Sequence, residues 1–287
     1  MKDKARGPVL LVGASGRVGR MVLRHWPVAR VAVVPQYRQD APRGALLWVP
    51  FEGPGALLEH QARAAAPVRA LVMMAGVTPG PGRDVRENRA IADATLAAAQ
   101  AAGIGRVLVA SSSAVYGAGE AFDEDAPCAP VNAYGAAKLE MEAACDAWRD
   151  RGLDVCALRI GNVAGADALL QNVANGGAEV ALDMFGDGSG PVRSYIGPRS
   201  LAEVLATLSL HEGSLPARLN IAAPVPVTMA ALARAAGARI RPCPAPPGAY
   251  QRITLDCGRL AALRAFAAEE SDPAEMVRQW RAAAAQG

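Results

Sequence analysis

The sequence predicts an α/β fold: a doubly wound parallel sheet of the Rossmann type with a small C-terminal lobe. Two observations lead to this prediction. Short, uninterrupted apolar runs alternate with helical segments through the first 160 residues, and a glycine-rich turn follows the first apolar run. Continuous apolar strands separated by helices are typical of a parallel sheet covered on both faces. At 287 residues, the chain is long enough for one large domain or a domain with a smaller lobe.

The elements follow from composition and pattern, taken in chain order. Strands are predicted over residues 8–12, 30–34, 69–75, 106–111 and 154–160, where the runs are apolar. Helices are predicted between them, over residues 17–25, 55–66, 84–102 and 132–151. The regular alternation ends near residue 160, which we take as the end of the first domain.

The remaining residues, 161–287, are expected to form the interleaved C-terminal lobe. Glycines crowd residues 176–190 and prolines crowd residues 242–247. A strand at 218–222 is expected to return to the main sheet, and a short helix to cover 228–236. The last helix is predicted to start with Asp272 as N-cap and Pro273 at its first position, with Glu275 closing a capping box.

Composition excludes several classes of protein. Apolar residues make up 52% and charged residues 20%, and the net charge of +3 is spread without a basic run, which argues against a nucleic-acid partner. The charged residues 1–6 run directly into a strand, so no signal peptide is expected, and apolar runs such as 70–77 are too short to cross a membrane. Five cysteines without C-x-x-C spacing indicate reduced thiols in a cytoplasmic protein. Three scattered histidines favour neither a metal site nor a Ser-His-Asp triad.

The glycine-rich turn has the spacing G-x-x-G-x-x-G at Gly13, Gly16 and Gly19. The first glycine permits a tight turn, the second lets the backbone approach a pyrophosphate, and the third lets the helix pack closely. The start of the helix offers free N–H groups to phosphates. We therefore predict a dinucleotide-binding domain over residues 1–160, with Ser15 and Arg17 in the turn also contacting the cofactor, NAD or NADP.

The end of the second strand indicates whether the cofactor is NAD or NADP. NAD is commonly held there by an acidic residue that accepts bonds from the ribose hydroxyls. This chain has Pro35-Gln36-Tyr37-Arg38, and no carboxylate comes before Asp40. Arg38 would suit the 2′-phosphate of NADP, which we therefore prefer; the alternative is a solvated loop arginine.

Tyr134 and Lys138 lie four residues apart in a predicted helix, so they share a face. A nearby ammonium and a positive nicotinamide would favour the phenolate and lower the pKa of the tyrosine. Tyr134 would then exchange a proton with a substrate hydroxyl during hydride transfer. Lys138 would also bind the nicotinamide ribose, and Ser112 would hydrogen-bond the substrate oxygen. In isolation, such a pair is more often an ordinary surface pair.

The chain resembles the extended short-chain dehydrogenase/reductase family, in its NAD-dependent epimerase/dehydratase group, from Val9 to about Leu232. Six motifs carry the resemblance in order: the glycine turn, Asn88 in its helix, Ser-Ser-Ser-Ala-Val-Tyr-Gly at 111–117, Tyr134 with Lys138, Leu-Arg-Ile-Gly-Asn-Val-Ala-Gly at 158–165, and Gly-Asp-Gly at 186–188 followed by Arg-Ser-Tyr-Ile at 193–196.

The resemblance implies roles for individual residues. Ser112 corresponds to the catalytic Ser or Thr four residues before the Val-Tyr-Gly tyrosine, and Ser113 to a residue facing the sugar. Asn88 supports the active site, and with Ala75 it is placed on the cofactor side. Asn162 opens the substrate loop, and Arg193 matches an arginine that often holds a nucleotide-sugar phosphate. A loop cap and a surface arginine are the alternatives for these last two.

Departures from the family pattern narrow the reaction. Sugar dehydratases of this family carry Asp-Glu after the catalytic Thr, where this chain has Ser113 and Ala114, so dehydration is disfavoured. No acidic residue follows the third strand at 47–51, and Gly197 replaces the family's usual histidine. The stretch from 165 to 186 looks short, which suggests a smaller or more open substrate pocket.

Together these observations predict an NAD(P)-dependent oxidoreductase or epimerase that acts on a sugar or nucleotide sugar, with Tyr134 as acid/base. Two alternatives stay open: a simple dehydrogenase or reductase of a small free sugar, sugar acid or lactone, and a non-catalytic NAD(P)-sensing binding protein. The resemblance also implies a homodimer.

Overall fold

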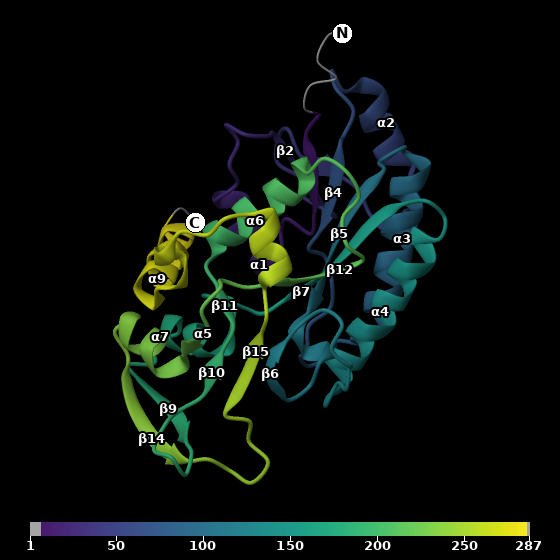
Figure 1. Ribbon diagram of the computed structural model, residues 1–287. Helices are drawn as coiled ribbons and strands as arrows, with labels where there is room; N and C mark the ends of the chain where they lie inside the picture. The colour runs from purple at the N-terminus through teal and green to yellow at the C-terminus, as the bar shows by residue number, and fades with distance from the viewer. Residues whose placement is uncertain (1–6, 286–287) are drawn as a thin grey trace.

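Seven parallel strands form the central sheet of the computed structural model, which describes residues 7–285 (Figure 1). The six N-terminal residues, on which the expectation about a signal peptide depends, lie outside the described residues. The strand order is β12-β7-β5-β4-β1-β2-β3. The strands are β1 (Val9–Val12), β2 (Val33–Tyr37), β3 (Leu46–Leu47), β4 (Ala70–Met73), β5 (Arg106–Ser112), β7 (Asp154–Ile160) and β12 (Arg218–Ile221).

Helices cover both faces of this sheet, as the apolar runs require. Helices α2 (Gly55–Arg63), α3 (Glu87–Ala101) and α4 (Ala133–Arg149) cover one face, and α1 (Arg17–Arg24) and α6 (Pro198–Leu210) cover the other (Figure 1). Successive strand residues pack into cores on opposite faces of the sheet. Leu10 belongs to the cluster with Leu96 and Met141, whereas Leu11 belongs to the cluster with Val22 and Leu205. Because side chains alternate across a strand, a sheet buried on both faces gives uninterrupted apolar runs.

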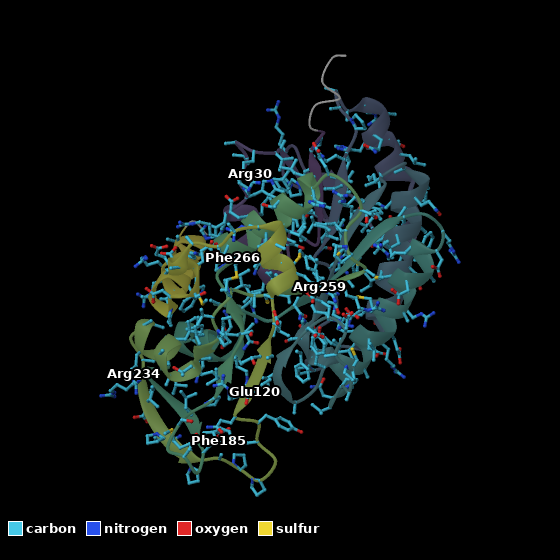
Figure 2. All side chains as sticks on the ribbon, in the orientation of Figure 1. Arg30, Glu120, Phe185, Arg234, Arg259 and Phe266 are labelled. Atoms are coloured by element: carbon cyan, nitrogen blue, oxygen red, sulfur yellow. The ribbon has the colours of Figure 1, made fainter. Side chains whose placement is uncertain are left out.

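The C-terminal lobe lies beyond the carboxyl ends of the strands (Figure 1). One of its sheets has the order β13-β10-β15-β6, and β9 pairs in parallel with β14 in another. An ion pair between Glu120 and Arg252 links β6 to β15 at 2.5 Å, and Arg259 reaches Glu124 at 3.3 Å. Figure 2 labels Glu120 and Arg259. The lobe strands are β6 (Gly119–Phe122), β8 (Asn162–Val163), β9 (Glu179–Met184), β10 (Val192–Arg193), β11 (Tyr195–Ile196), β13 (Val227–Thr228), β14 (Arg239–Pro244) and β15 (Arg252–Leu255). Its helices are α5 (Ala168–Ala174), α7 (Met229–Ala235), α8 (Gly258–Leu263) and α9 (Pro273–Ala284).

The chain passes between the two parts more than once. Strand β6, from the first half of the sequence, belongs to a lobe sheet, whereas α6 and β12, from the second half, belong to the main layer. Strand β12 pairs in parallel with β7, at the place where the sequence predicts a returning strand. Residues 1–160 and residues 161–287 therefore each contribute to both the main domain and the lobe.

Two local predictions were wrong. The second strand begins at Val33, three residues later than expected, because residues 27–31 form a turn in which Arg30 N donates to Pro27 O at 2.8 Å. Asp272 caps α9 by accepting from Ala274 N at 2.9 Å, but Glu275 instead bonds Arg278 and Gln279, so no capping box forms. Within residues 7–285, no helix has the length and apolarity needed to span a membrane.

Candidate active site

A cavity of about 240 Å³ opens at the carboxyl ends of β4, β5 and β7. The chain builds β1, β2 and β3 in one direction across the sheet and then crosses back to build β4 and β5 on the other side. Such a reversal point is where open α/β sheets bind ligands. The residues that line the cavity include Gly76, Ser112, Tyr134, Lys138, Asn162 and Asp167.

The three positions of the turn carry glycine for different physical reasons. Gly13 has φ +84°, and a Cβ there would lie 2.5 Å from the backbone N of Ala75. A Cβ on Gly19 would lie 2.1 Å from Gly13 O. Both positions therefore require glycine for folding alone, and Ala75 closes the turn from the β4 side.

Gly16 is different, because the protein itself leaves room for a side chain there. Its Cβ would meet only Gly13 O at 3.3 Å, and its φ of −69° is ordinary. It is the N-cap of α1, and no side chain caps the N–H groups of that helix. This open space beside free N–H groups fits a dinucleotide pyrophosphate.

Gln36 takes the strand-end position beside the turn. It is 2% exposed; its Oε1 accepts from Gly13 N at 2.8 Å and its Nε2 donates to Trp48 O. The sequence reasoning noted the missing acid but not this role, which its place at the strand end beside the first glycine could have indicated. Of the other predicted cofactor residues, Ser15 and Arg38 are exposed, and Arg17 reaches the lobe by donating to Ala166 O at 3.2 Å.

Strand β5 and helix α4 bring Ser112, Tyr134 and Lys138 to the same cavity. Helix α4 starts at the Asn132 cap, whose Oδ1 accepts from Gly135 N at 2.9 Å. A Cβ on Gly135 would lie 2.3 Å from Ala114 O, so this glycine lets the helix approach the end of β5 closely. Lys138 is 4% exposed; its Nζ donates to Ala110 O at 2.9 Å and lies 5.9 Å from the Tyr134 ring centre.

The protonation preferences in this cavity follow from burial. Burial raises the pKa of Tyr134, while the Ser112 hydroxyl acts to lower it. This net direction is opposite to the effect expected of a nearby ammonium, because burial outweighs the hydrogen bond from Ser112. Burial also lowers the pKa of Lys138 to about 8, against the opposing influence of Cys145 and Glu142.

Asn88 shapes the site from behind. The side chain is fully buried; its Oδ1 accepts from Val77 N at 3.0 Å, and its Nδ2 donates to Val77 O at 2.9 Å and to Val85 O at 2.7 Å. A Cβ on Gly76 would lie 2.7 Å from Asn88 Oδ1 and 3.3 Å from Lys138 Nζ. Asn88 therefore fixes the loop after β4 that lines the cavity.

A second cavity of about 310 Å³ adjoins the first and shares Ser112, Tyr134 and Asn162 with it. Ser113 and Arg193, both predicted to face the substrate, line this second cavity. The Arg193 guanidinium donates only to backbone carbonyls: Val192 O and Tyr250 O at 2.8 Å each, and Gln251 O at 2.9 Å. Among the described residues it forms no ion pair, so its charge is not neutralised by a carboxylate.

Asp167 is a cavity residue that the sequence reasoning missed. It caps α5 by accepting from Leu170 N at 3.2 Å, and it also accepts from Gly165 N at 3.1 Å and from the Tyr195 hydroxyl at 3.3 Å. Burial raises its pKa. An aspartate directly before Ala-Leu-Leu is a recognisable N-cap signal, and its position five residues after Asn162 could have placed it near the site.

The fold and the two joined cavities define the class of protein: a doubly wound α/β protein with its ligand site at the carboxyl ends of the strands. The chain belongs to the NAD dependent epimerase/dehydratase family, whose model matches residues 9–222. It is therefore an enzyme-family member with the expected Rossmann-type fold.

The chain is also similar to individual relatives. Over 85 residues it is 47% identical to a UDP-glucose 4-epimerase of Azospirillum brasilense, an alignment that spans 29% of this chain and only 24% of the relative. The structure of TunA, an NAD dependent NDP-hexosamine 5,6-dehydratase involved in tunicamycin biosynthesis, matches with a TM-score of 0.76 at 19% identity, covering 98% of this chain and 99% of that one. MoeE5 in complex with UDP-glucuronic acid and NAD matches with a TM-score of 0.76 at 22% identity, covering 98% and 100%. At these identities, the two structures establish the shared fold.

Proposed function

We propose that this chain is an NAD(P)-dependent 4-epimerase of a nucleotide sugar. The observation that carries the proposal is that Ser112 and Tyr134 line both cavities, so a ligand in either cavity meets the same two hydroxyls, while the buried Lys138 lines the first cavity beside them. The similarity to the Azospirillum brasilense UDP-glucose 4-epimerase supports the choice of reaction, over the part of the chain that it covers.

In this proposal the reacting sugar carbon lies at the junction of the two cavities. Tyr134, as the phenolate that the Lys138 ammonium and the nicotinamide charge would stabilise, takes the proton of the sugar hydroxyl and returns it, and Ser112 orients the same sugar oxygen. Lys138 holds a positive charge behind the phenol and donates to the cofactor ribose. The nicotinamide, when bound, supplies the two-electron oxidation and reduction of the sugar carbon.

Two features of the second cavity support a nucleotide sugar and argue against dehydration. Arg193 presents an unneutralised guanidinium, which suits a diphosphate if it exchanges backbone carbonyls for phosphate oxygens. Ser113 and Ala114 are neutral, and no carboxylate lines this cavity among the described residues. A dehydratase needs groups that protonate a leaving hydroxyl and remove a proton from carbon, and these side chains cannot do so.

For the cofactor, we propose that NADP is bound better than NAD. MoeE5 was solved with NAD, but in this chain uncharged Gln36 holds the glycine turn and Arg38 lies exposed two residues further. A 2′-phosphate would therefore meet a cation and no carboxylate. Replacing Arg38 by Ala is expected to weaken NADP binding about tenfold and to leave NAD binding unchanged, as measured by titration calorimetry. An equal effect on both cofactors would contradict this choice.

The direct test of the reaction is to incubate the protein with UDP-glucose and cofactor and to follow the sugar by proton NMR. Appearance of the 4-epimer supports the proposal. Accumulation of reduced cofactor in proportion to substrate would favour the simple dehydrogenase instead. Cofactor binding without turnover of any UDP-sugar or small sugar would favour the binding protein.

We further propose a homodimer in the cytoplasm. Helices α3 and α4 lie side by side on one face of the sheet (Figure 1), and the family resemblance assigns them to the dimer contact. All five cysteines are unpaired, which suits a reducing compartment. The molar mass in solution tests the dimer.

A further inference from the structure

A buried polar layer lies directly beneath the Ser112 level of the sheet. Ser111, Arg159 and Asn220 are in register on the neighbouring strands β5, β7 and β12, and they are 5%, 2% and 0% exposed. The next register row above them pairs Ser112 with Ile160 and Ile160 with Ile221. Ser111 itself lines the first cavity, so the polar layer reaches the cavity at the end of β5.

One carboxylate, that of Glu142 on α4, binds two members of this layer, Ser111 and Arg159. Glu142 is 1% exposed, and its Oε1 accepts from Ser111 Oγ at 2.6 Å. Its Oε2 accepts from Arg159 at 2.8 Å and from Arg218 at 3.3 Å. Helix α4 is thus tied to the ends of three strands through a single side chain.

The same helix face carries the proposed catalytic pair. Tyr134, Lys138 and Glu142 follow one another at intervals of four residues, so they lie on successive turns, about 6 Å apart along the axis. Two bonds then join this face to the residues that precede Ser112: Lys138 Nζ to Ala110 O at 2.9 Å, and Ser111 Oγ to Glu142 at 2.6 Å.

We propose that Glu142 is the positioning residue of this site: by holding Ser111 it sets the place of Ser112 relative to Tyr134, and it keeps a negative charge beside Lys138. The inference about the charge beside Lys138 stands on geometry and charge alone. The inference about the place of Ser112 rests on the proposed function, because it concerns how the Ser112 and Tyr134 hydroxyls meet a substrate oxygen.

The negative charge beside Lys138 is assigned to Glu142, whose carboxylate forms ion pairs with Arg159 and Arg218. Burial lowers the pKa of Lys138, and Cys145 and Glu142 oppose this. Burial raises the pKa of the Cys145 thiol to about 12, so that thiol is uncharged near pH 8. The titratable and charged groups around the two side chains are Tyr134, Cys145 and Asp146 on α4, Asp93 on α3, Tyr116 and Cys128 after β5, Arg159 on β7 and Arg218 on β12.

The sequence allows this charge effect to be measured without any substrate. The chain has three lysines, Lys2, Lys4 and Lys138. Labelling lysine with carbon-13 at the ε position therefore gives few signals, and the Lys138 signal is assigned by its loss in Lys138→Met. We expect Glu142→Gln to move the Lys138 titration to lower pH, and Glu142→Asp and Ser111→Ala to leave it near that of the wild type. An unchanged titration in Glu142→Gln would overturn the charge assignment.

The positioning role of Glu142 is tested by Ser111→Ala, which removes the bond to Glu142 and leaves the Glu142–Arg159 ion pair in place. Turnover of UDP-glucose is expected to fall about tenfold or more in kcat with little change in KM, and Ser111→Thr is expected to restore it. The matched control is Ser209→Ala, which removes a buried hydroxyl bond of 2.7 Å to Leu205 O on α6, away from the cavities. Equal kcat in Ser111→Ala and Ser209→Ala would overturn the positioning role.

These outcomes separate this inference from the proposed function. If the wild type turns over no UDP-sugar, the proposed function fails, while the lysine titration still decides whether Glu142 sets the charge beside Lys138. If Glu142→Gln does not fold, the comparison of Ser111→Ala with Ser209→Ala decides the positioning role on its own.

Discussion

Single residues in the glycine turn show what a motif does and does not reveal. The spacing of the glycines predicts a dinucleotide turn, but it cannot say which glycine the fold needs. The structure separates them, because Gly13 and Gly19 are required by backbone contacts of 2.5 and 2.1 Å, whereas a Cβ on Gly16 would meet only Gly13 O, at 3.3 Å.

A pair of alanine substitutions tests this separation. Gly13→Ala is expected to destabilise the protein by roughly 1–3 kcal/mol, because the residue has φ +84° and its Cβ would press on Ala75 N. Gly16→Ala is expected to fold nearly as well as the wild type and to lose cofactor affinity. Denaturant unfolding and cofactor titration measure the two effects, and a Gly16→Ala variant with normal cofactor affinity would contradict the phosphate assignment.

Lys138 gives a prediction about pH. Its pKa of about 8 in the folded protein lies below its ordinary value of 10.5, so between these values the unfolded chain binds more protons. Stability contributed by this residue therefore rises with pH across that window. The free energy of unfolding of the wild type, relative to Lys138→Met, is expected to increase by roughly 1–3 kcal/mol from pH 8 to 10.5. A flat difference over this range would show that Lys138 is not held in a desolvated site.

Residue spacing could predict that Tyr134 and Lys138 share a helix face, and chain order could place Ser112 near them. Gln36 and Asp167 each had a local signal, at the strand end and at the N-cap of α5. Glu142 could not be predicted, because its role depends on partners such as Arg159 that only the folded sheet brings near. Arg193 was predicted as a phosphate ligand, but its bonds to the 250–251 backbone depend on a proline-rich loop whose path has no simple sequence signal.

At the scale of elements, the central strands and helices were predictable because buried parallel strands give uninterrupted apolar runs. The β9–β14 pair was not predicted, since glycines and prolines crowd its surroundings and β14 is largely exposed. Helix α4 matters most for the site, because its first turn carries Tyr134 and its third carries Glu142. The start of that helix should therefore affect function as well as stability.

Two N-caps allow this to be tested. Asn132 caps α4 by accepting from Gly135 N at 2.9 Å, and Thr228 caps α7 by accepting from Ala231 N at 3.1 Å. Each Ala substitution is expected to cost about 1 kcal/mol of stability. Only Asn132→Ala should also lower kcat, because it loosens the turn that holds Tyr134. Equal kcat in the two variants would contradict the link between the cap and the site.

At the scale of the whole molecule, the site exists because the two halves of the sequence interleave. The first half supplies Ser112 and Tyr134 at the carboxyl ends of the strands, and the second half supplies Asn162 and Arg193 to the same pair of cavities. The expectation of a short stretch from 165 to 186, with a smaller or more open substrate pocket, stays a prediction. The match to MoeE5 covers 98% of this chain and 100% of that one, so the two chains share the fold over their length.

The most direct test of the central claim is proton NMR of UDP-glucose incubated with cofactor and either wild-type protein or Tyr134→Phe. The wild type is expected to produce the 4-epimer, and Tyr134→Phe to be slower by roughly 10²–10⁴-fold while binding the cofactor normally. Turnover in Tyr134→Phe at the wild-type rate would contradict the account.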